Sequence, residues 1–177
     1  MNTLWKQITP SDFAWEREAL EFLKARLPDH EPYRAWANFE FIALDGSINE
    51  VDTLVLTPKG LFLVEIKSHP GEIGGDAGAW IWTHEGRRRV FDNPRLLAER
   101  KAKKLKSLLE SQRSAHVGGG QSKERLPFIE TLVFLSAENV VNKLQGPARL
   151  QVCTRKTVMD ALCRIDSTRT HRRLDRP

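Results

Sequence analysis

The chain has 177 residues, a net charge of +5 and 40% hydrophobic residues, which suits a single domain with a substantial core. No apolar segment approaches the roughly 20 residues that cross a bilayer, and no secretory signal opens the sequence. Its two cysteines, Cys153 and Cys163, form no metal-type cluster. We therefore expect a cytoplasmic protein without a membrane partner, and we exclude a zinc ribbon and a disulfide scaffold.

The first part of the chain predicts a helix, an extended segment and a hairpin. Ser11 or Asp12 would cap a helix that runs to about Arg26. Its apolar stripe at helical spacing consists of Trp15, Ala19, Phe22, Leu23 and Leu27. An extended segment follows at about 33–44. Strands 50–57 and 60–67 are joined at Pro58-Lys59, where proline favours a tight turn.

The second part of the chain predicts a loop, a small hairpin and a long helix. Residues 68–78 hold four glycines and a proline and are expected to be loop. Segments 79–83 and 87–91 would form the small hairpin. Asn93-Pro94 is a strong helix start, and the helix would run to about Gln112. Its inward-facing residues would be Ala98, Ala102, Leu105 and Leu109.

The remaining segments close the domain. A glycine-rich stretch at 114–125 is expected to be a mobile loop. Segments 128–135 and 150–154 would be strands, and 156–165 a closing helix. We thus expect one domain over residues 1–165, followed by a basic flexible tail or linker over 166–177.

Positive charge is concentrated on the long helix. Between residues 95 and 106 six Lys or Arg side chains stand against one acid, and three arginines at 87–89 precede them. Such a face can follow a nucleic-acid backbone, with Arg100, Lys101 and Lys104 as the candidate phosphate contacts. It can equally be a solvated helix face, and the sequence leaves both interpretations open.

The first hairpin places two acids side by side. If it turns on Pro58-Lys59, Asp52 lies opposite Glu65 and Glu50 lies opposite Lys67, with all four side chains on one face. Neighbouring carboxylates repel each other unless a cation neutralises them.

Both faces of this hairpin are otherwise apolar. One face would carry Leu54, Leu56, Leu61 and Leu63, and the other Val51, Val55, Phe62, Val64 and Ile66. Strands that are apolar on both faces are covered on both, so the hairpin is expected at the centre of the sheet.

A divalent cation would neutralise the two buried acids. Oxygens of Asp52 and Glu65, the backbone carbonyl of Ile66 and several waters would hold Mg²⁺ or Mn²⁺. Lys67 would reach an attacking water or a phosphate oxygen, which together is the equipment for phosphodiester hydrolysis. The competing interpretation is structural: Glu50 pairs with Lys67 while Asp52 caps a strand end.

Two smaller features have two interpretations each, and a third does not support a nucleotide site. Trp80 and Trp82 point the same way and would either stack on bases or, as we favour, pack in the core. His69 would be a general base or a loop histidine without a role. The glycines at 71–75 lack the lysine and serine of a phosphate loop.

The ordered set of residues resembles the nuclease-related domain (NERD) family of the PD-(D/E)xK nuclease superfamily. The resemblance spans residues 12–110 and is carried by segments 50–55 and 60–67, Gly71, Gly78, Trp80 and Asn93-Pro94. It implies an α/β fold, a restriction-endonuclease-like core with a mixed central β-sheet flanked by helices.

The resemblance also implies roles for individual residues. Asp52 and Glu65 would be metal ligands, and Lys67 the catalytic lysine. Glu16 would be the first-helix glutamate that faces the metal or its waters, with Glu18 as its rival, because helical register alone does not decide between them.

One position departs from the family pattern. Members often carry glutamine where this chain has Leu97; Lys101, one turn further, would reach the phosphate instead. Members with such a lysine-rich helix resemble modules attached to kinase-type domains in bacterial phage-defence proteins. We therefore expect metal-dependent cleavage or nicking of DNA within a larger defence protein. The alternative is a catalytically weak, nuclease-derived domain that binds nucleic acid or a partner domain for targeting or regulation.

Overall fold

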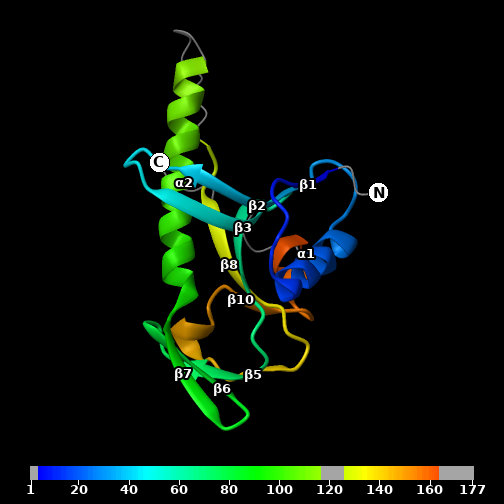
Figure 1. The fold of residues 1–177 in the computed structure, drawn as a ribbon. Helices are drawn as coiled ribbons and strands as arrows, with labels where there is room; N and C mark the ends of the chain where they lie inside the picture. The colour runs from blue at the N-terminus through cyan, green and yellow to red at the C-terminus, as the bar shows by residue number, and fades with distance from the viewer. Residues whose placement is uncertain (1–3, 117–125, 164–177) are drawn as a thin grey trace, which may run out of the picture.

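The computed structural model describes residues 4–116 and 126–163. Its centre is a mixed six-stranded sheet in the order β1-β2-β3-β4-β8-β10 (Figure 1). The strands are β1 (Trp5–Gln7), β2 (Arg34–Ile42), β3 (Ile48–Thr57), β4 (Gly60–Lys67), β8 (Ile129–Leu135) and β10 (Val152–Thr154). Strands β2, β3 and β4 are antiparallel, whereas β1 pairs with β2, β4 with β8, and β8 with β10 in parallel. The expected mixed α/β fold is confirmed, with the β3–β4 hairpin at the middle of the sheet.

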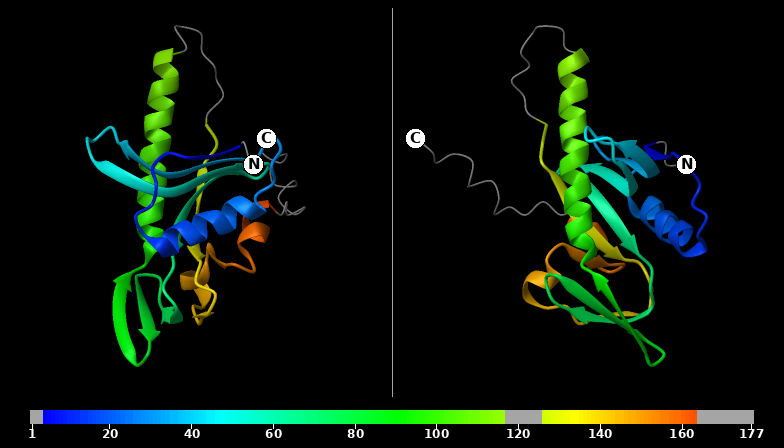
Figure 2. Two further views of the ribbon diagram at one scale, coloured as in Figure 1. Left: turned by 45° about the vertical axis from the view of Figure 1, so that its right-hand side comes forward. Right: turned by 60° about the vertical axis from the view of Figure 1, so that its left-hand side comes forward.

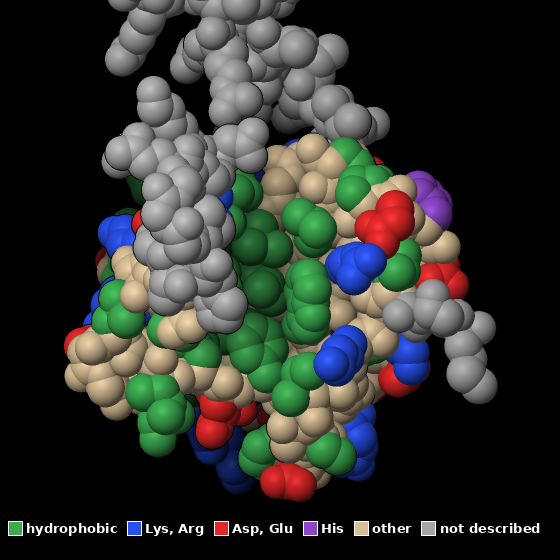
Figure 3. All heavy atoms as spheres, turned by 90° about the horizontal axis from the view of Figure 1, so that it is seen from above, with side chains coloured by type: hydrophobic (Ala, Val, Ile, Leu, Met, Phe, Trp, Pro, Cys, Tyr) green, Lys and Arg blue, Asp and Glu red, His purple; other side chains and the backbone are tan. Residues whose placement is uncertain are grey.

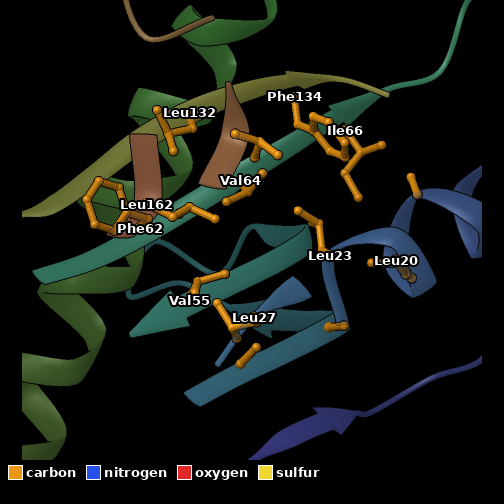
Figure 4. Close-up of a cluster of buried hydrophobic side chains, with 14 of the residues drawn as sticks. Leu20, Leu23, Leu27, Val55, Phe62, Val64, Ile66, Leu132, Phe134 and Leu162 are labelled. Carbon is orange, nitrogen blue, oxygen red and sulfur yellow. The ribbon is translucent and has the colours of Figure 1, made fainter. Parts of the chain in front are cut away.

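Helices cover both faces of this sheet. Helix α1 (Ala14–Arg26) and the short α3 (Val158–Cys163) lie on one face, where Leu20, Leu23 and Leu162 are buried against β3, β4 and β8 (Figure 4). Helix α2 (Pro94–His116) covers the other face, with Ala98, Ala102 and Leu105 turned inward as expected. Burial on both faces explains why both strands of the hairpin are apolar along most of their length.

A second, smaller sheet lies at the N-terminal end of α2 (Figures 1 and 2). Its order is β7-β6-β5-β9, with β5 (Gly71–Gly75), β6 (Ala79–His84), β7 (Arg87–Asp92) and β9 (Val140–Asn142). The expectation of a loop over 68–78 was therefore wrong for residues 71–75. Glycine is needed there for close backbone approach: a Cβ on Gly71, which has φ of 99°, would lie 2.4 Å from the carbonyl oxygen of Thr83.

Helices α1 and α2 differ from the sequence expectation in three respects: the N-cap of α1, the exposure of one of its residues and the end of α2. The N-cap of α1 is Phe13, whose side chain has no polar atom to form a capping bond, and the expected cap Ser11 instead contacts Glu16 and accepts the backbone N–H of Phe13. Trp15, expected on the apolar stripe, is 56% exposed. Helix α2 begins as expected, with Asn93 Oδ1 accepting the N–H of Arg95 at 2.9 Å, but it continues to His116.

Several segments were not anticipated or lie outside the description. Strands β1 and β9 and the 3₁₀ turn η1 (Gly146–Arg149) are too short to give a sequence pattern. The expected loop at 114–125 falls partly in α2 and partly outside the described residues. The expected tail from residue 166 lies wholly outside them. Within residues 4–116 and 126–163, no helix combines the length and apolar character needed to span a membrane.

An apolar groove remains between α2 and the turn end of the β3–β4 hairpin. It has a volume of about 650 Å³ and is bordered by Leu54, Leu56, Leu61, Leu105 and Leu109, among others. Hydrophobic side chains gather in a hollow on the face seen from the C-terminal end of α2 (Figure 3). The packing of α2 on the sheet is thus tight near its start and open further along.

Candidate active site

The candidate site begins where β3 and β4 stop pairing. Their backbone pairs run from Thr57–Gly60 to Thr53–Val64, which confirms the register expected from the Pro58-Lys59 turn. One residue further, Oδ2 of Asp52 accepts the backbone N–H of Ile66 at 2.6 Å. A side-chain oxygen therefore satisfies the first N–H beyond the ladder, and this bond fixes the Asp52 carboxylate at the open end of the hairpin.

The alternation of side chains changes at the same place. Ala37 of β2 belongs to the apolar cluster under α1, whereas Phe39, two residues on, packs in the cluster under α2. Between them, Asn38 has a left-handed backbone with φ of 53°. Val51, which pairs with Phe39, lies on the α2 side with Leu54, so the expectation that it shares a face with Val55 was wrong.

Glu65 is the buried centre of the site. Its side chain is 5% exposed, and each of its oxygens contacts a lysine. Lys67 Nζ lies 2.9 Å from Oε1, as expected for residues two apart on one strand face. Lys101 Nζ reaches Oε2 from α2 at 2.8 Å. The competing ion pair of Glu50 with Lys67 is replaced by this three-residue cluster, and Glu50 instead lies opposite Glu40 of β2.

Burial acts in the same direction on both carboxylates, but their pKa values shift in opposite directions. Burial and the charge of Glu65 raise the pKa of Asp52 to about 7, despite the Ile66 N–H bond and the two lysines. Burial also acts to raise the pKa of Glu65, but Lys67 and Lys101 outweigh it, so that this pKa lies below its usual value. The lysines thus outweigh burial at Glu65, whereas at Asp52 burial and the charge of Glu65 outweigh the lysines.

Lys101 occupies a different environment from the one proposed for it. It is 8% exposed and bound to Glu65, below the surface of the basic helix. The sequence contained a signal for this placement, because Lys101 is three residues from Ala98 and four from Leu105, on the buried stripe of α2. Leu97, at the position where family members often have glutamine, is 45% exposed.

The first turn of α1 lies beside the end of β4. The Ser68 hydroxyl donates to the carbonyl oxygen of Trp15 at 3.5 Å, which brings this turn next to the residue that follows Lys67. Glu16 is half-buried, bonded to Ser11, and borders a cavity together with Glu50. Glu18 points elsewhere and pairs with Arg155 at 2.6 Å. Glu18 is thus engaged in an ion pair, whereas the cavity that Glu16 borders includes none of Asp52, Glu65 and Lys67, so the role of Glu16 stays a prediction.

A recess of about 390 Å³ opens beside Glu65 and Lys67. Its walls come from the second sheet and the start of α2, and they include His69, Trp82, Phe91 and Leu97. Trp80 and Trp82 are 1% and 6% exposed, as expected for core residues, although both also border this recess. Sequence analysis did not anticipate the recess, because its walls meet only when the two sheets are in place.

His69 forms part of this wall. Its ring lies 5.1 Å from that of Trp82 and 5.9 Å from that of Phe91. Burial, followed by the charges of Lys67 and Arg89, lowers the pKa of His69, so the neutral imidazole is favoured near pH 7.

The other two candidate phosphate contacts differ in availability. Arg100 is exposed at the border of the recess, and its Nε donates to the carbonyl oxygen of Leu96 at 3.2 Å. Lys104 is half-buried and engaged with Asp45 at 2.9 Å and with the Ser47 hydroxyl at 2.7 Å. Arg100 is therefore the better placed of the two to contact a ligand at the site.

The donor set suits a hard divalent cation. Asp52 and Glu65 supply carboxylate oxygens next to the carbonyl-bearing strand end at Ile66, and Mg²⁺ or Mn²⁺ uses one or two carboxylates with waters. Burial and the charge of Glu65 raise the pKa of Asp52, and a cation bound beside it would favour its ionised form. Among the described residues no group of three or more His, Cys, Asp or Glu side chains gathers to hold an ion, so most ligands would be water or substrate.

Comparison with known proteins gives two matches. The family model for the nuclease-related domain matches residues 11–136, which include all of α1, the β3–β4 hairpin and α2. The Probable kinase PglW of Streptomyces coelicolor (strain ATCC BAA-471 / A3(2) / M145) is 46% identical over 106 residues, 59% of this chain and 7% of that protein. The chain thus spans only a small part of the length of this relative. The search of the solved structures found no significant match.

Proposed function

We propose, from the premise that this chain belongs to the nuclease-related domain (NERD) family, that it hydrolyses phosphodiester bonds of DNA with Mg²⁺ or Mn²⁺. The observation that carries the proposal is the meeting of Asp52, Glu65 and Lys67 at the open end of the central hairpin. The resemblance stated from the sequence is confirmed at the level of the family. The reaction, the metal and the DNA substrate are our proposal.

Asp52, Glu65 and the carbonyl of Ile66 would hold the cation, which when bound supplies a water of lowered pKa and positive charge for the phosphate. Lys67 uses one of its three N–H donors on Glu65, which leaves the others for a phosphate oxygen or the attacking water. Glu16 is assigned to the waters beside the site. Water oxygen bonds to phosphorus as the bond to one strand oxygen breaks, giving a phosphate monoester and a hydroxyl.

The parent protein is the second part of the proposal. The name of the relative is that of a kinase, and the match covers 7% of its length. A nuclease-related module joined to further domains, kinase-type domains among them, would act in the cytoplasm. There it would cut DNA as part of a defence against phage, as the lysine-rich α2 led us to expect.

The direct test is nicking of supercoiled plasmid by the purified protein with Mn²⁺. We expect nicking by the unmodified chain and a loss of about 100-fold or more for Lys67→Ala and for Asp52→Asn. Lys6→Ala is the matched control, because Lys6 is an exposed lysine on β1. Activity that survives both site substitutions would overturn the assignment of the site.

A specific observation also favours a second candidate function. Both oxygens of Glu65 already contact lysines, so this carboxylate is neutralised without a metal. A nuclease-derived domain that binds nucleic acid or a partner domain, without cleaving, would have the same arrangement, and Leu97 in place of glutamine is consistent with it. Such a domain would retain DNA in EDTA, with an affinity that falls steeply as salt rises. The nuclease proposal instead requires that cleavage depend on the added metal.

A further inference from the structure

The recess beside the site has an aromatic and apolar interior. Trp82 is fixed by its Nε1, which donates to the carbonyl oxygen of Pro70 at 2.7 Å. The His69 ring packs between Trp82 and Phe91. Phe91 remains 41% exposed and Leu97 45% exposed, so the recess has an open, unpartnered hydrophobic surface. Flat aromatic walls of this kind provide stacking surfaces for a planar ring.

The charges of the recess lie at its border. Lys67 and Glu65 mark the end next to the candidate site, and Arg100 and Asp92 also line it. Asn93 is not available to a ligand, because its amide donates to the carbonyl oxygen of Ala77 and its oxygen accepts from Arg95. An apolar interior next to two cations suits a planar uncharged group that is joined to an anionic one.

We propose that this recess receives one unstacked nucleobase of the strand whose phosphate lies at Lys67. The volume of about 390 Å³ falls within the range of ligand sites and accommodates a base with part of its sugar. The base would stack on Phe91 and His69, while Arg100 and Lys67 contact the flanking phosphates. Asp92 would accept a hydrogen bond from an exocyclic amino group.

This inference names the substrate class of the proposed nuclease. Bases of an intact duplex are stacked and paired and do not enter a side recess, whereas a single strand, a frayed end or an extruded base does. The preferred substrate is therefore DNA with an unpaired nucleotide at the site. The inference rests on the proposed function for the position of the phosphate, but binding of the base does not require cleavage.

The test measures binding in EDTA, so that hydrolysis plays no part. Fluorescence anisotropy would compare the full chain on a labelled single strand of about 20 nucleotides, on its duplex, and on an abasic strand of equal charge. We expect the single strand to bind about tenfold more tightly than the abasic strand. Equal affinity for these two strands would overturn the proposal, because phosphate contacts alone would then explain the binding.

Phe91→Ala and Val90→Ala form a matched pair of variants. Both residues are exposed on β7, at 41% and 64%, and neighbouring strand residues point to opposite sides. Val90 does not line the recess. We expect Phe91→Ala to weaken single-strand binding about tenfold with duplex binding unchanged, and Val90→Ala to change neither. Equal effects of the two substitutions would overturn the proposal.

The outcomes separate this proposal from the nuclease proposal. If a single strand binds in a manner that depends on Phe91 but no metal-dependent cleavage occurs, the recess proposal is supported and the nuclease proposal is overturned. Cleavage that is unaffected by Phe91→Ala and equally fast on intact duplex would support hydrolysis and overturn the recess. Failure to bind any of the three DNA probes in EDTA would overturn the recess proposal, whereas absence of nicking with Mn²⁺ would overturn the nuclease proposal. Unchanged thermal melting of Phe91→Ala would show that its effect is local.

Discussion

The two ends of the β3–β4 hairpin are built from the same strands and behave differently. At the turn end the backbone pairs are continuous from Thr53–Val64 to Thr57–Gly60, and the neighbouring side chains are apolar. At the open end the pairing stops, and Asp52 takes the N–H of Ile66 with its side chain. The regular end stabilises the sheet, and the open end places charged groups where other elements meet.

The difference shows where this fold accepts buried charge. Removing a carboxylate from water is unfavourable unless it is paired and hydrogen-bonded. At the open end α2 supplies Lys101, α1 contacts Ser68, and the second sheet walls the recess. The turn end is bordered instead by an apolar groove. Among the described residues, the buried carboxylates of this hairpin lie at its open end, which supports our proposal that the site is there.

The largest effect is expected for Glu65, because its removal leaves two lysines without their anion. Glu65→Gln should lower the free energy of unfolding by about 3 to 5 kcal/mol, as for other broken buried pairs. Lys101→Met should also destabilise, and the double variant should be much less destabilised than the sum of the two. Urea unfolding of the four proteins measures the coupling. Additive effects would contradict a mutual Glu65–Lys101 contact.

The second largest effect is expected in the pH dependence of stability, to which Asp52 contributes through its raised pKa. Burial and Glu65 raise the pKa of Asp52 to about 7 in the folded chain, against 3.8 for the ordinary carboxyl group. The folded state therefore binds this proton more tightly than the unfolded state. Its stabilising contribution is complete below about pH 4 and is lost as pH rises through about 7.

Metal-free wild-type protein should thus lose about 4 kcal/mol relative to Asp52→Asn between pH 4 and pH 8. Thermal melting of both proteins across this range gives the difference. Mn²⁺ should remove most of the difference at pH 8, because the cation favours ionised Asp52. A difference that grows in favour of wild type with rising pH would contradict the raised pKa.

A smaller effect is expected at the turn end. Lys59 Nζ donates to the carbonyl oxygen of Ala161 at 2.8 Å and so links the turn to α3. Lys59→Met should lower stability by about 1 kcal/mol, the typical value of one hydrogen bond. Nicking activity and DNA affinity should stay unchanged when measured well below the melting temperature. A loss of activity would show that the two ends are not independent.

The smallest effect is expected on the basic helix. Arg100 is exposed, whereas Lys104 is engaged with Asp45 and Ser47. Arg100→Ala should weaken DNA binding about threefold and lower the salt dependence by about one ion. Lys104→Ala should change binding less, because its ammonium is already paired. Titrations at several salt concentrations distinguish the two, and equal effects would indicate that the whole helix face contacts DNA.

Sequence reasoning succeeded where the controlling interactions are local. The Pro58-Lys59 turn and strand alternation give the register of the hairpin, and Asn93-Pro94 gives the start of α2. It failed at 71–75, where glycines suggested loop although close packing of two strands requires them. Trp15 was assigned to the core from helical spacing, but it is 56% exposed and stacks on Phe13 with ring centroids 4.9 Å apart.

The candidate site divides in the same way. Asp52, Glu65 and Lys67 follow from two neighbouring strands, whereas Lys101 reaches Glu65 across 36 positions of sequence. Sequence analysis assigned Lys101 to a phosphate contact; its spacing from Ala98 and Leu105 was a signal for burial, but the anion that it meets depends on packing. The choice between Glu16 and Glu18 also depended on packing, because Arg155, far along the chain, pairs with Glu18. Their roles in catalysis remain predictions for the experiments above.

By itself, the sequence determined the family, the mixed α/β fold and the register of the hairpin as far as Thr53–Val64, because short-range spacing and turn chemistry specify these features. Tertiary structure alone decided the change of faces at Asn38, the Lys101–Glu65 contact and the aromatic recess. Each of these depends on how distant segments pack together. Burial there raises the pKa of Asp52 and brings Lys101 to Glu65, and neither follows from a local pattern of residues.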